Sequence, residues 1–177
     1  MSYSIEPAFT VTKELSRQLI KVSTQAKNQW FFPEGGFSSN SLDHIGDMWV
    51  HENFVVISDT EIIAYFEGQW ARPLNILLNF RLILLDEKKS FFACKAFFQY
   101  LEYLFVSRGC DVFNWSVATE NRHAYLLYEK FVKKNCGHIV GRRTRSLQSY
   151  CGKISDSVLY EISKEEYFDW KDSNQRK

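Results

Sequence analysis

Hydrophobic residues alternate with polar ones, or form short uninterrupted runs, at several separate places along the chain, and each of these stretches predicts a β-strand. The turn Ser58-Asp59-Thr60 between two of them predicts a hairpin. The run at residues 74–85 is the most apolar and fits the middle of a sheet that is covered on both faces. The predicted strands occupy residues 3–6, 54–57, 61–67, 74–85, 111–117 and 157–162.

Three other stretches repeat their apolar residues at intervals of three and four, which predicts amphipathic helices. Thr119 or Asn121 is placed to cap the third helix, and Gly137 follows its end. The apolar faces consist of Leu15, Leu19, Val22 and Ala26 in the first helix, Phe91, Cys94, Phe98, Leu101 and Phe105 in the second, and Ala124, Leu127, Tyr128, Phe131 and Val132 in the third.

The predicted elements follow one another as strand, helix, three strands, helix, strand, helix and two strands, when the Gly- and Arg-containing segment 138–145 is counted as a strand. This order indicates a mixed α/β fold. A chain of 177 residues suits one hydrophobic core. We therefore expect a single domain at residues 1–163, followed by a polar tail at residues 164–177 whose aromatic residues dock on the domain or on a partner.

Composition narrows the possible functions. A hydrophobic fraction of 45% and an aromatic fraction of 16% argue against disorder. Lys and Arg number 22 against 21 for Asp and Glu, and a net charge of +1 offers no general field for a nucleic acid or an anionic membrane. The four cysteines and four histidines show no zinc-ligand spacing, so we expect no metal. Without a signal peptide or a membrane span, a reducing cytoplasm is the simplest location.

Two polar residues interrupt the most apolar predicted strand. Asn79 and Arg81 are two positions apart, so both side chains point to the same face of the strand. A buried charge there requires a partner or a ligand. A salt bridge or an exposed strand end accounts for Arg81 equally well.

The segment from residue 111 to residue 162 resembles the C-terminal half of the GNAT-type N-acyltransferases. In that family a strand, an Asn, a helix carrying Ala and Tyr-Glu-Lys-Phe, and a Gly-containing strand occur in this order. The matching set extends over about fifty residues and looks most like the branch that acetylates protein N-termini and small amines. It comprises Asn121, Ala124, Leu127, Tyr128, Glu129, Lys130, Phe131, Gly137, Val140, Gly141, Gly152, Asp156, Leu159, Tyr160, Glu161 and Ile162.

The resemblance implies a GNAT acyl-CoA N-acyltransferase fold, with a central, mostly antiparallel, twisted sheet of six to seven strands and about four flanking helices. It also implies an enzyme that transfers an acetyl group from acetyl-CoA to a primary amine on a protein or a small molecule. Tyr128 occupies the place of the family's catalytic Tyr, which protonates the leaving thiolate. Asn121, with Ala124 nearby, occupies the place of the Asn that binds the pantetheine arm. From spacing alone, Tyr128 fits a core aromatic residue as well.

In the family, backbone amides between the central strand and the next helix hold the pyrophosphate of the cofactor, with the help of a basic residue and spaced glycines. In this chain Lys88 takes the basic position, while Phe91 and Ala93 stand where small residues are needed. A side chain at such a site redirects the loop or excludes the phosphate. The other residues expected at this cofactor site are Leu84, Lys89 and Ser90. The two lysines also fit a solvated turn.

The general base has no clear counterpart in the sequence. Relatives that acetylate ribosomal proteins carry a Glu five residues before the Asn, where this chain has Ser116. Glu67 is the candidate that we select, with Glu120, His51 or a chain of water molecules as substitutes.

Three further expectations concern partners and assembly. The first is an alternative function, in which a GNAT-fold protein without acetyl transfer acts as a binding or regulatory module. Its contacts would be the aromatic loop Trp30-Phe31-Phe32 or the tail. In the family this loop folds over the acceptor, and it equally suits packing onto the body. The second is a nucleic-acid contact at residues 142–145, which the near-neutral charge disfavours. The third is the oligomeric state, a monomer or a homodimer.

Overall fold

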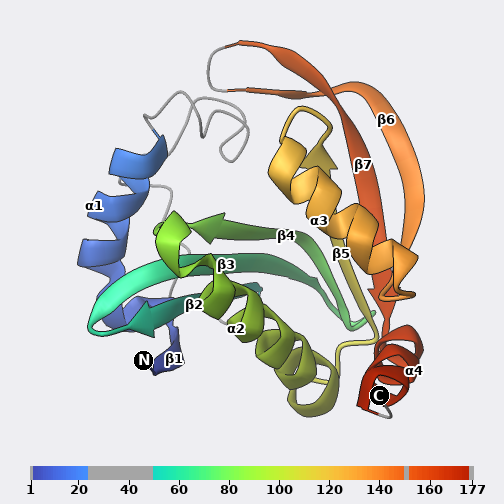
Figure 1. Ribbon diagram of the computed structural model, residues 1–177, viewed down its shortest axis with the longest axis horizontal. Coiled ribbons are helices and arrows are strands. Elements are labelled where there is room, and N and C mark those ends of the chain that lie inside the picture. The colour runs from blue at the N-terminus through green and yellow to red at the C-terminus, as the bar shows by residue number, and fades with distance from the viewer. Residues whose placement is uncertain (1, 24–49, 150–151, 176–177) are drawn as a thin grey trace.

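A seven-stranded sheet forms the centre of the molecule in the computed structural model, which describes residues 2–23, 50–149 and 152–175 (Figure 1). The aromatic loop at residues 30–32, His44 and Cys151 lie outside these described residues. The strands are β1 (Tyr3–Pro7), β2 (His51–Ser58), β3 (Glu61–Ala71), β4 (Ile76–Leu84), β5 (Val112–Ala118), β6 (His138–Gln148) and β7 (Ile154–Ser163).

Four α-helices accompany the sheet in the described part of the chain. They are α1 (Thr12–Ser23), α2 (Ser90–Glu102), α3 (Arg122–Lys133) and α4 (Lys164–Gln175). Up to β7 the elements follow one another in the predicted order, because each has a clear periodicity of its own. The segment after Ser163, expected as a polar tail, forms helix α4, in which Tyr167 is buried and Trp170 stacks on Phe98.

The strands lie in the order β1-β2-β3-β4-β5-β7-β6. Neighbouring strands are antiparallel except β4 and β5, which are parallel and are connected through α2. The predicted fold class, a mostly antiparallel sheet of six to seven strands with about four helices, is therefore confirmed. The apolar strand β4 lies at the centre of the sheet, as its composition indicates.

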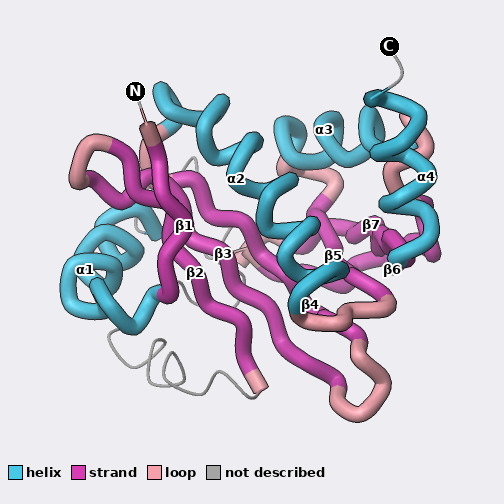
Figure 2. The backbone as a smooth tube through the Cα atoms, turned by 90° about the horizontal axis from the view of Figure 1, so that it is seen from below, coloured by secondary structure: helices cyan, strands magenta, loops and turns pink. Residues whose placement is uncertain are grey.

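The two faces of the sheet carry separate hydrophobic clusters. Figure 2 shows α1 on one face and α2 and α3 on the other. Leu15 and Leu19 of α1 pack with Val55, Tyr65 and Ile83. The larger cluster on the opposite face is rich in aromatic rings, including Phe66, Phe80, Phe97, Tyr100 and Phe113. Side chains two positions apart in a strand point to the same face of the sheet. A residue can therefore be assigned to the face of the cluster that contains the residue two positions away.

The second predicted helix, which carries Phe91 to Phe105, changes its winding before it ends. After Glu102 it continues as a π-helix at Tyr103–Ser107, in which the N–H of Arg108 donates to the carbonyl of Tyr103 at 3.1 Å. This wider turn brings the Arg108 guanidinium to the fully buried carboxylate of Glu52, at 2.7 Å. The indole N–H of Trp70 donates to the same carboxylate oxygen at 2.8 Å. The end of α2 is thus tied to β2 and β3 by polar contacts that periodicity does not reveal.

Candidate functional site

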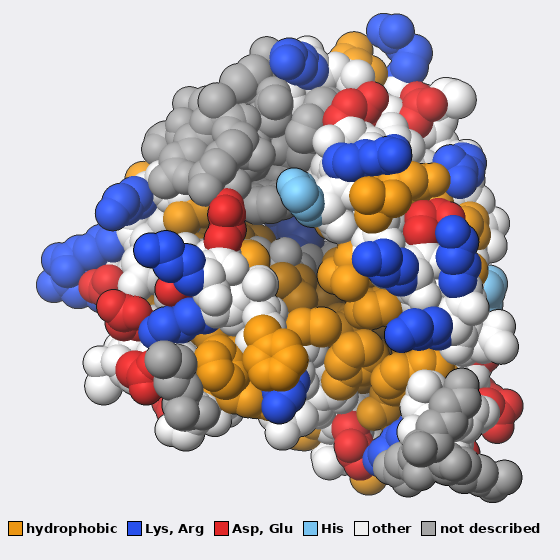
Figure 3. Space-filling model, in the orientation of Figure 1, with side chains coloured by type: hydrophobic (Ala, Val, Ile, Leu, Met, Phe, Trp, Pro, Cys, Tyr) orange, Lys and Arg blue, Asp and Glu red, His pale blue; other side chains and the backbone are white. Residues whose placement is uncertain are grey.

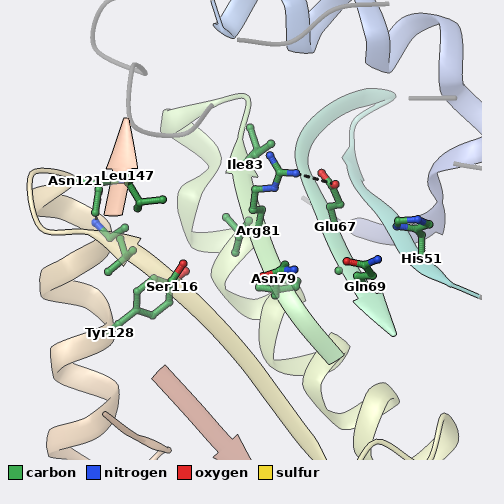
Figure 4. A pocket seen from close by; sticks show the side chains of 16 residues that line it. His51, Glu67, Gln69, Asn79, Arg81, Ile83, Ser116, Asn121, Tyr128 and Leu147 are labelled. Carbon is green, nitrogen blue, oxygen red and sulfur yellow. Dashed lines mark hydrogen bonds and ion pairs between the residues drawn. The ribbon is translucent and has the colours of Figure 1, made fainter. Parts of the chain in front are cut away.

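The parallel strands β4 and β5 separate part of the way along their length. They pair at Ile76 with Val112, at Leu77 with Phe113 and at Phe80 with Trp115. The register shifts between Leu77 and Phe80, where Asn79 has a positive φ of 54°. Such a bulge bends a strand and interrupts its pairing. β4 then continues to Leu84 and β5 to Ala118, and the two ends diverge and leave the sheet open between them (Figure 4).

A cavity of about 680 Å³ occupies this opening. β3, β4, β5, α3 and the end of β6 all contribute to its lining. Figure 3 shows the surface hollowed between α2 and α3, with hydrophobic side chains along the hollow. Among the residues expected at the site, the cavity brings together Glu67, Asn121, Ala124 and Tyr128, together with His51.

Asn121 positions helix α3 at the cavity. Its side-chain oxygen accepts a hydrogen bond from the backbone N–H of Ala124 at 3.5 Å, so Asn121 rather than Thr119 caps the helix. The Asn121 N–H donates to the carbonyl of Ala118 at 3.0 Å, which fixes the short turn after β5. The open end of β5 and the start of α3 are therefore held together at the cavity wall.

Tyr128 points into the cavity from α3 (Figure 4). Its ring packs against Trp115 and Tyr160, with centroids 5.2 and 5.5 Å away. Burial raises the pKa of its hydroxyl well above the usual range, with a smaller contribution from the Cys94 thiol. The phenol is therefore protonated at neutral pH, as a proton donor has to be. The packed ring agrees with a core aromatic residue, and the position of the side chain at the cavity is compatible with a proton donor, so the catalytic role of Tyr128 stays a prediction.

Glu67 reaches the opening from the other face of the sheet. Tyr65 and Ile83 belong to the α1-side cluster, and Glu67 and Arg81 lie two residues along the same strands, so they share that face. Their side chains form a salt bridge, with Arg81 Nη2 3.0 Å from Glu67 Oε1. The partner expected for Arg81 is thus a carboxylate on the neighbouring strand.

Two other polar residues line the cavity from the α1 side. His51, on the face of β2 that carries Val55, lies next to Gln69 across the strand pair. Ser116 lies between Trp115 and Val117, which join the opposite cluster, so its hydroxyl faces the α1 side. Proton-accepting groups and the Tyr128 phenol therefore approach the opening from opposite faces of the sheet.

The residues predicted to hold the pyrophosphate lie elsewhere. Leu84, Lys88, Lys89, Ser90, Phe91 and Ala93 are all absent from the cavity lining. The segment begins with a 3-10 helix at Glu87–Lys89, which leads directly into α2. Phe91 is 64% exposed and Ala93 is buried at 2%. Their role in binding a donor stays a prediction.

Sequence reasoning missed several residues of the cavity wall. Leu147 comes from the far end of β6, and Gln69 follows Gly68 at a register shift in β3. Leu147 has no distinctive neighbour in the sequence, because the β6–β7 hairpin brings it to the site, and Gln69 is placed there by the bulge. The only available signal was Gly68, since glycine within a strand often marks a bulge.

Two kinds of feature are absent from the part of the chain that the structure describes. No group of three or more His, Cys, Asp or Glu side chains is arranged to hold a metal ion. No helix in these residues has the length and apolar character needed to cross a membrane.

Comparison with solved structures defines the class of fold. A scan against protein-family models and a search of curated protein sequences gave no match. Among solved structures, spermidine N-acetyltransferase from Vibrio cholerae in complex with CoA and spermine is similar at a TM-score of 0.73 and 20% identity, over 94% of this chain and 98% of that one. A probable GNAT-family acetyltransferase from Chromobacterium violaceum has a TM-score of 0.73 and 13% identity, over 94% of this chain and 90% of that one.

A third similar structure is that of an enzyme whose name gives a protein as its substrate. Ribosomal-protein-S18-alanine N-acetyltransferase from Escherichia coli has a TM-score of 0.67 and 13% identity, over 92% of this chain and 94% of its own. The chain has the fold of the GNAT acetyltransferases, as the resemblance of residues 111–162 implied.

Proposed function

We propose that this protein transfers an acetyl group from a pantetheine thioester, such as acetyl-CoA, to a primary amine. The observation that carries the proposal is the open pair of β4 and β5, with a cavity between them and Tyr128 pointing into it. The spermidine N-acetyltransferase with the same fold was solved with CoA and spermine, which supports a thioester donor and an amine acceptor. The alternative of a module without acetyl transfer gains no support from these comparisons.

The opening suits an extended acyl-pantetheine arm. Where β4 and β5 no longer pair, their facing backbone N–H and C=O groups are available to an arm that contains amide groups of its own. The Asn121 side chain adds a polar contact at one wall of the cavity. A bound thioester supplies an activated carbonyl and a sulfur leaving group.

Acetyl transfer from a thioester to an ammonium requires three proton movements, and the residues on the two sides of the opening can supply them. Glu67 accepts a proton from the attacking ammonium through water, so that the amine nitrogen can form the new C–N bond. Tyr128 donates its phenolic proton to the departing sulfur as the C–S bond breaks, and the second proton lost by the acylated nitrogen restores the phenol. His51 lies on the same side as Glu67 and offers a second route for the first proton. The acceptor is a primary amine on a protein or on a small molecule.

Product analysis tests the proposal directly. The purified protein is incubated with acetyl-CoA or S-acetylpantetheine and a panel of polyamines, amino acids and peptides with free N-termini, and acetylated products are detected by mass spectrometry. The expected result is acetylation of at least one amine at a rate above that of the protein-free mixture. Failure with every donor and acceptor would refute the function.

Replacing Glu67 by Gln is expected to lower kcat about tenfold, because the amide cannot accept the proton. We expect a smaller effect than the loss of a sole base, since His51 and water remain at the same side of the cavity. Steady-state kinetics of Glu67→Gln, Glu67→Asp and the distant surface variant Glu14→Gln check this. Glu67→Asp is expected to recover part of the rate. Equal rates for Glu67→Gln and the parent protein would exclude Glu67 as the base.

A further inference from the structure

We propose that the donor site of this protein recognises the acyl-pantetheine arm and makes no productive contact with a nucleotide pyrophosphate, so that its donor class is a pantetheine thioester. The inference rests on the proposed acetyl transfer and defines its donor. It is drawn from the start of α2, where the chain leaves β4 beside the opening. A helix that begins there would ordinarily offer free backbone amides to an anion.

The amides of the 3-10 turn that leads into α2 already have acceptors. The side chain of Asp86 accepts a hydrogen bond from the Lys88 N–H at 3.0 Å, and its carbonyl accepts one from the Lys89 N–H at 3.2 Å. The Ser90 N–H donates to the carbonyl of Glu87. A phosphate that approached the Lys88 N–H would have to displace a carboxylate that belongs to the chain itself.

Carboxylates outnumber lysines around this turn. Asp86 and Glu87 lie in the turn with Lys88 and Lys89, and Asp59 and Glu61 approach it from the β2–β3 hairpin. Lys89 is held by that hairpin, with its ammonium 3.1 Å from Glu61 Oε2 and 3.6 Å from Asp59 Oδ2. These partners neutralise Lys89, whereas Lys88, in the basic position of the family pattern, is exposed and stands between Glu87 and Lys89.

A side chain also stands at the first turn of α2. Phe91 is 64% exposed, and the ammonium of Lys95 lies 4.7 Å from the centre of its ring. Binding of a phosphate by backbone amides requires close approach to the backbone, for which glycine is best suited. An aromatic ring thus stands at the first turn of α2, next to a turn whose amides have acceptors and whose lysines are outnumbered by carboxylates.

The cavity between β4 and β5 offers contacts of a different kind. It offers the diverging strands, Asn121 and Tyr128, all of which would contact the arm or the thioester rather than the nucleotide. Recognition of the donor is therefore concentrated on the part that all pantetheine thioesters share. That part can come from free CoA, from a small phosphopantetheine thioester or from a carrier protein that bears the arm.

Truncated donors test the inference. We expect kcat/KM for acetyl-CoA, S-acetyl-4′-phosphopantetheine and S-acetylpantetheine to agree within about threefold. A tenfold or larger advantage of acetyl-CoA over S-acetylpantetheine would overturn the inference and leave acetyl transfer intact, whereas inactivity of all donors would count against the proposed function.

An acetylated carrier protein identifies the source of the pantetheine arm. A rate at least tenfold above that of the free arm assigns the donor to a carrier, and an equal rate assigns it to the free thioester.

Binding provides a readout that does not depend on turnover. Calorimetric titrations with CoA and with pantetheine are expected to give similar Kd values. A Kd at least tenfold lower for CoA, or the absence of binding by both, would contradict recognition of the arm alone.

Substitutions at the start of α2 test whether Asp86 and Phe91 prevent recognition of the pyrophosphate. Asp86→Ser keeps a hydroxyl that can cap the helix and removes a negative charge, and Phe91→Gly removes the ring. The double variant is expected to prefer acetyl-CoA over S-acetylpantetheine by tenfold or more, whereas the control Glu165→Ser, at the exposed start of α4, is expected to show no preference. An unchanged donor ratio in a folded double variant would refute the assignment to Asp86 and Phe91.

Discussion

Replacing Tyr128 by Phe is expected to lower kcat a hundredfold or more and to leave the Kd of the donor nearly unchanged. The substitution removes only the hydroxyl, and the ring can keep its packing against Trp115 and Tyr160. Without the phenolic proton, the sulfur leaves as an unprotonated thiolate, which removes the contribution of the general acid. Steady-state kinetics together with calorimetric titration of the donor separate the two effects.

The matched control for this experiment is Tyr125→Phe on the same helix. The hydroxyl of Tyr125 accepts a hydrogen bond from Arg142 at 3.3 Å, at the surface between α3 and β6. Its removal is expected to change kcat less than threefold. An unchanged rate in Tyr128→Phe, or an equal loss in both variants, would remove Tyr128 from the mechanism.

The pH dependence of kcat follows from the burial of Tyr128. Because burial raises the pKa of Tyr128 above the usual value of 10.0, the acid form persists at higher pH than for an exposed Tyr. Deprotonation of Tyr128 is therefore expected to cause no fall in kcat as the pH rises from about 7 to about 10. A decline in that range which Tyr128→Phe abolishes would contradict the assignment.

The order of the elements up to β7 could be predicted from the sequence, because each strand or helix depends mainly on its own periodicity. The capping role of Asn121 was one of two local possibilities, and the structure selects it. The partner of Arg81 could not be named, because the choice of Glu67 depends on the register between β3 and β4. Register is a tertiary property when two strands offer several possible pairings.

The proposed donor site shows the same limit of sequence-based prediction more sharply. The sequence reveals that Phe91 stands where a small residue is expected. It does not reveal that Asp86 caps the turn or that Lys89 is paired with Glu61 on a distant hairpin. From the sequence the two lysines fit an anion site or a solvated turn, and the structure pairs Lys89 with Asp59 and Glu61. The position of a charge along the sequence is informative only once its neighbours in space are known.

Replacing Gly137 by Ala is expected to lower the free energy of unfolding by about 3 kcal/mol. Gly137 immediately precedes β6 and has a φ of +84°, a conformation that side chains disfavour. A Cβ built there would lie 2.5 Å from the carbonyl oxygen of Glu161, a backbone atom of β7 that cannot move without disturbing the strand. Left-handed strain and overpacking therefore act together, and the pairing of β6 with β7 has to shift.

The matched control for Gly137→Ala is Gly141→Ala, four residues further along in β6. A Cβ at Gly141 would meet no heavy atom within 4 Å, and its φ lies outside the left-handed range. We expect Gly141→Ala to change the free energy of unfolding by less than about 0.5 kcal/mol, as surface substitutions usually do. Urea unfolding followed by circular dichroism measures both. Equal stabilities of the two variants would show that β6 does not pass Glu161 as closely as described. A large loss confined to Gly137 would confirm that this glycine fixes the approach of β6 to β7, and with it the path of the hairpin that carries Leu147 to the cavity.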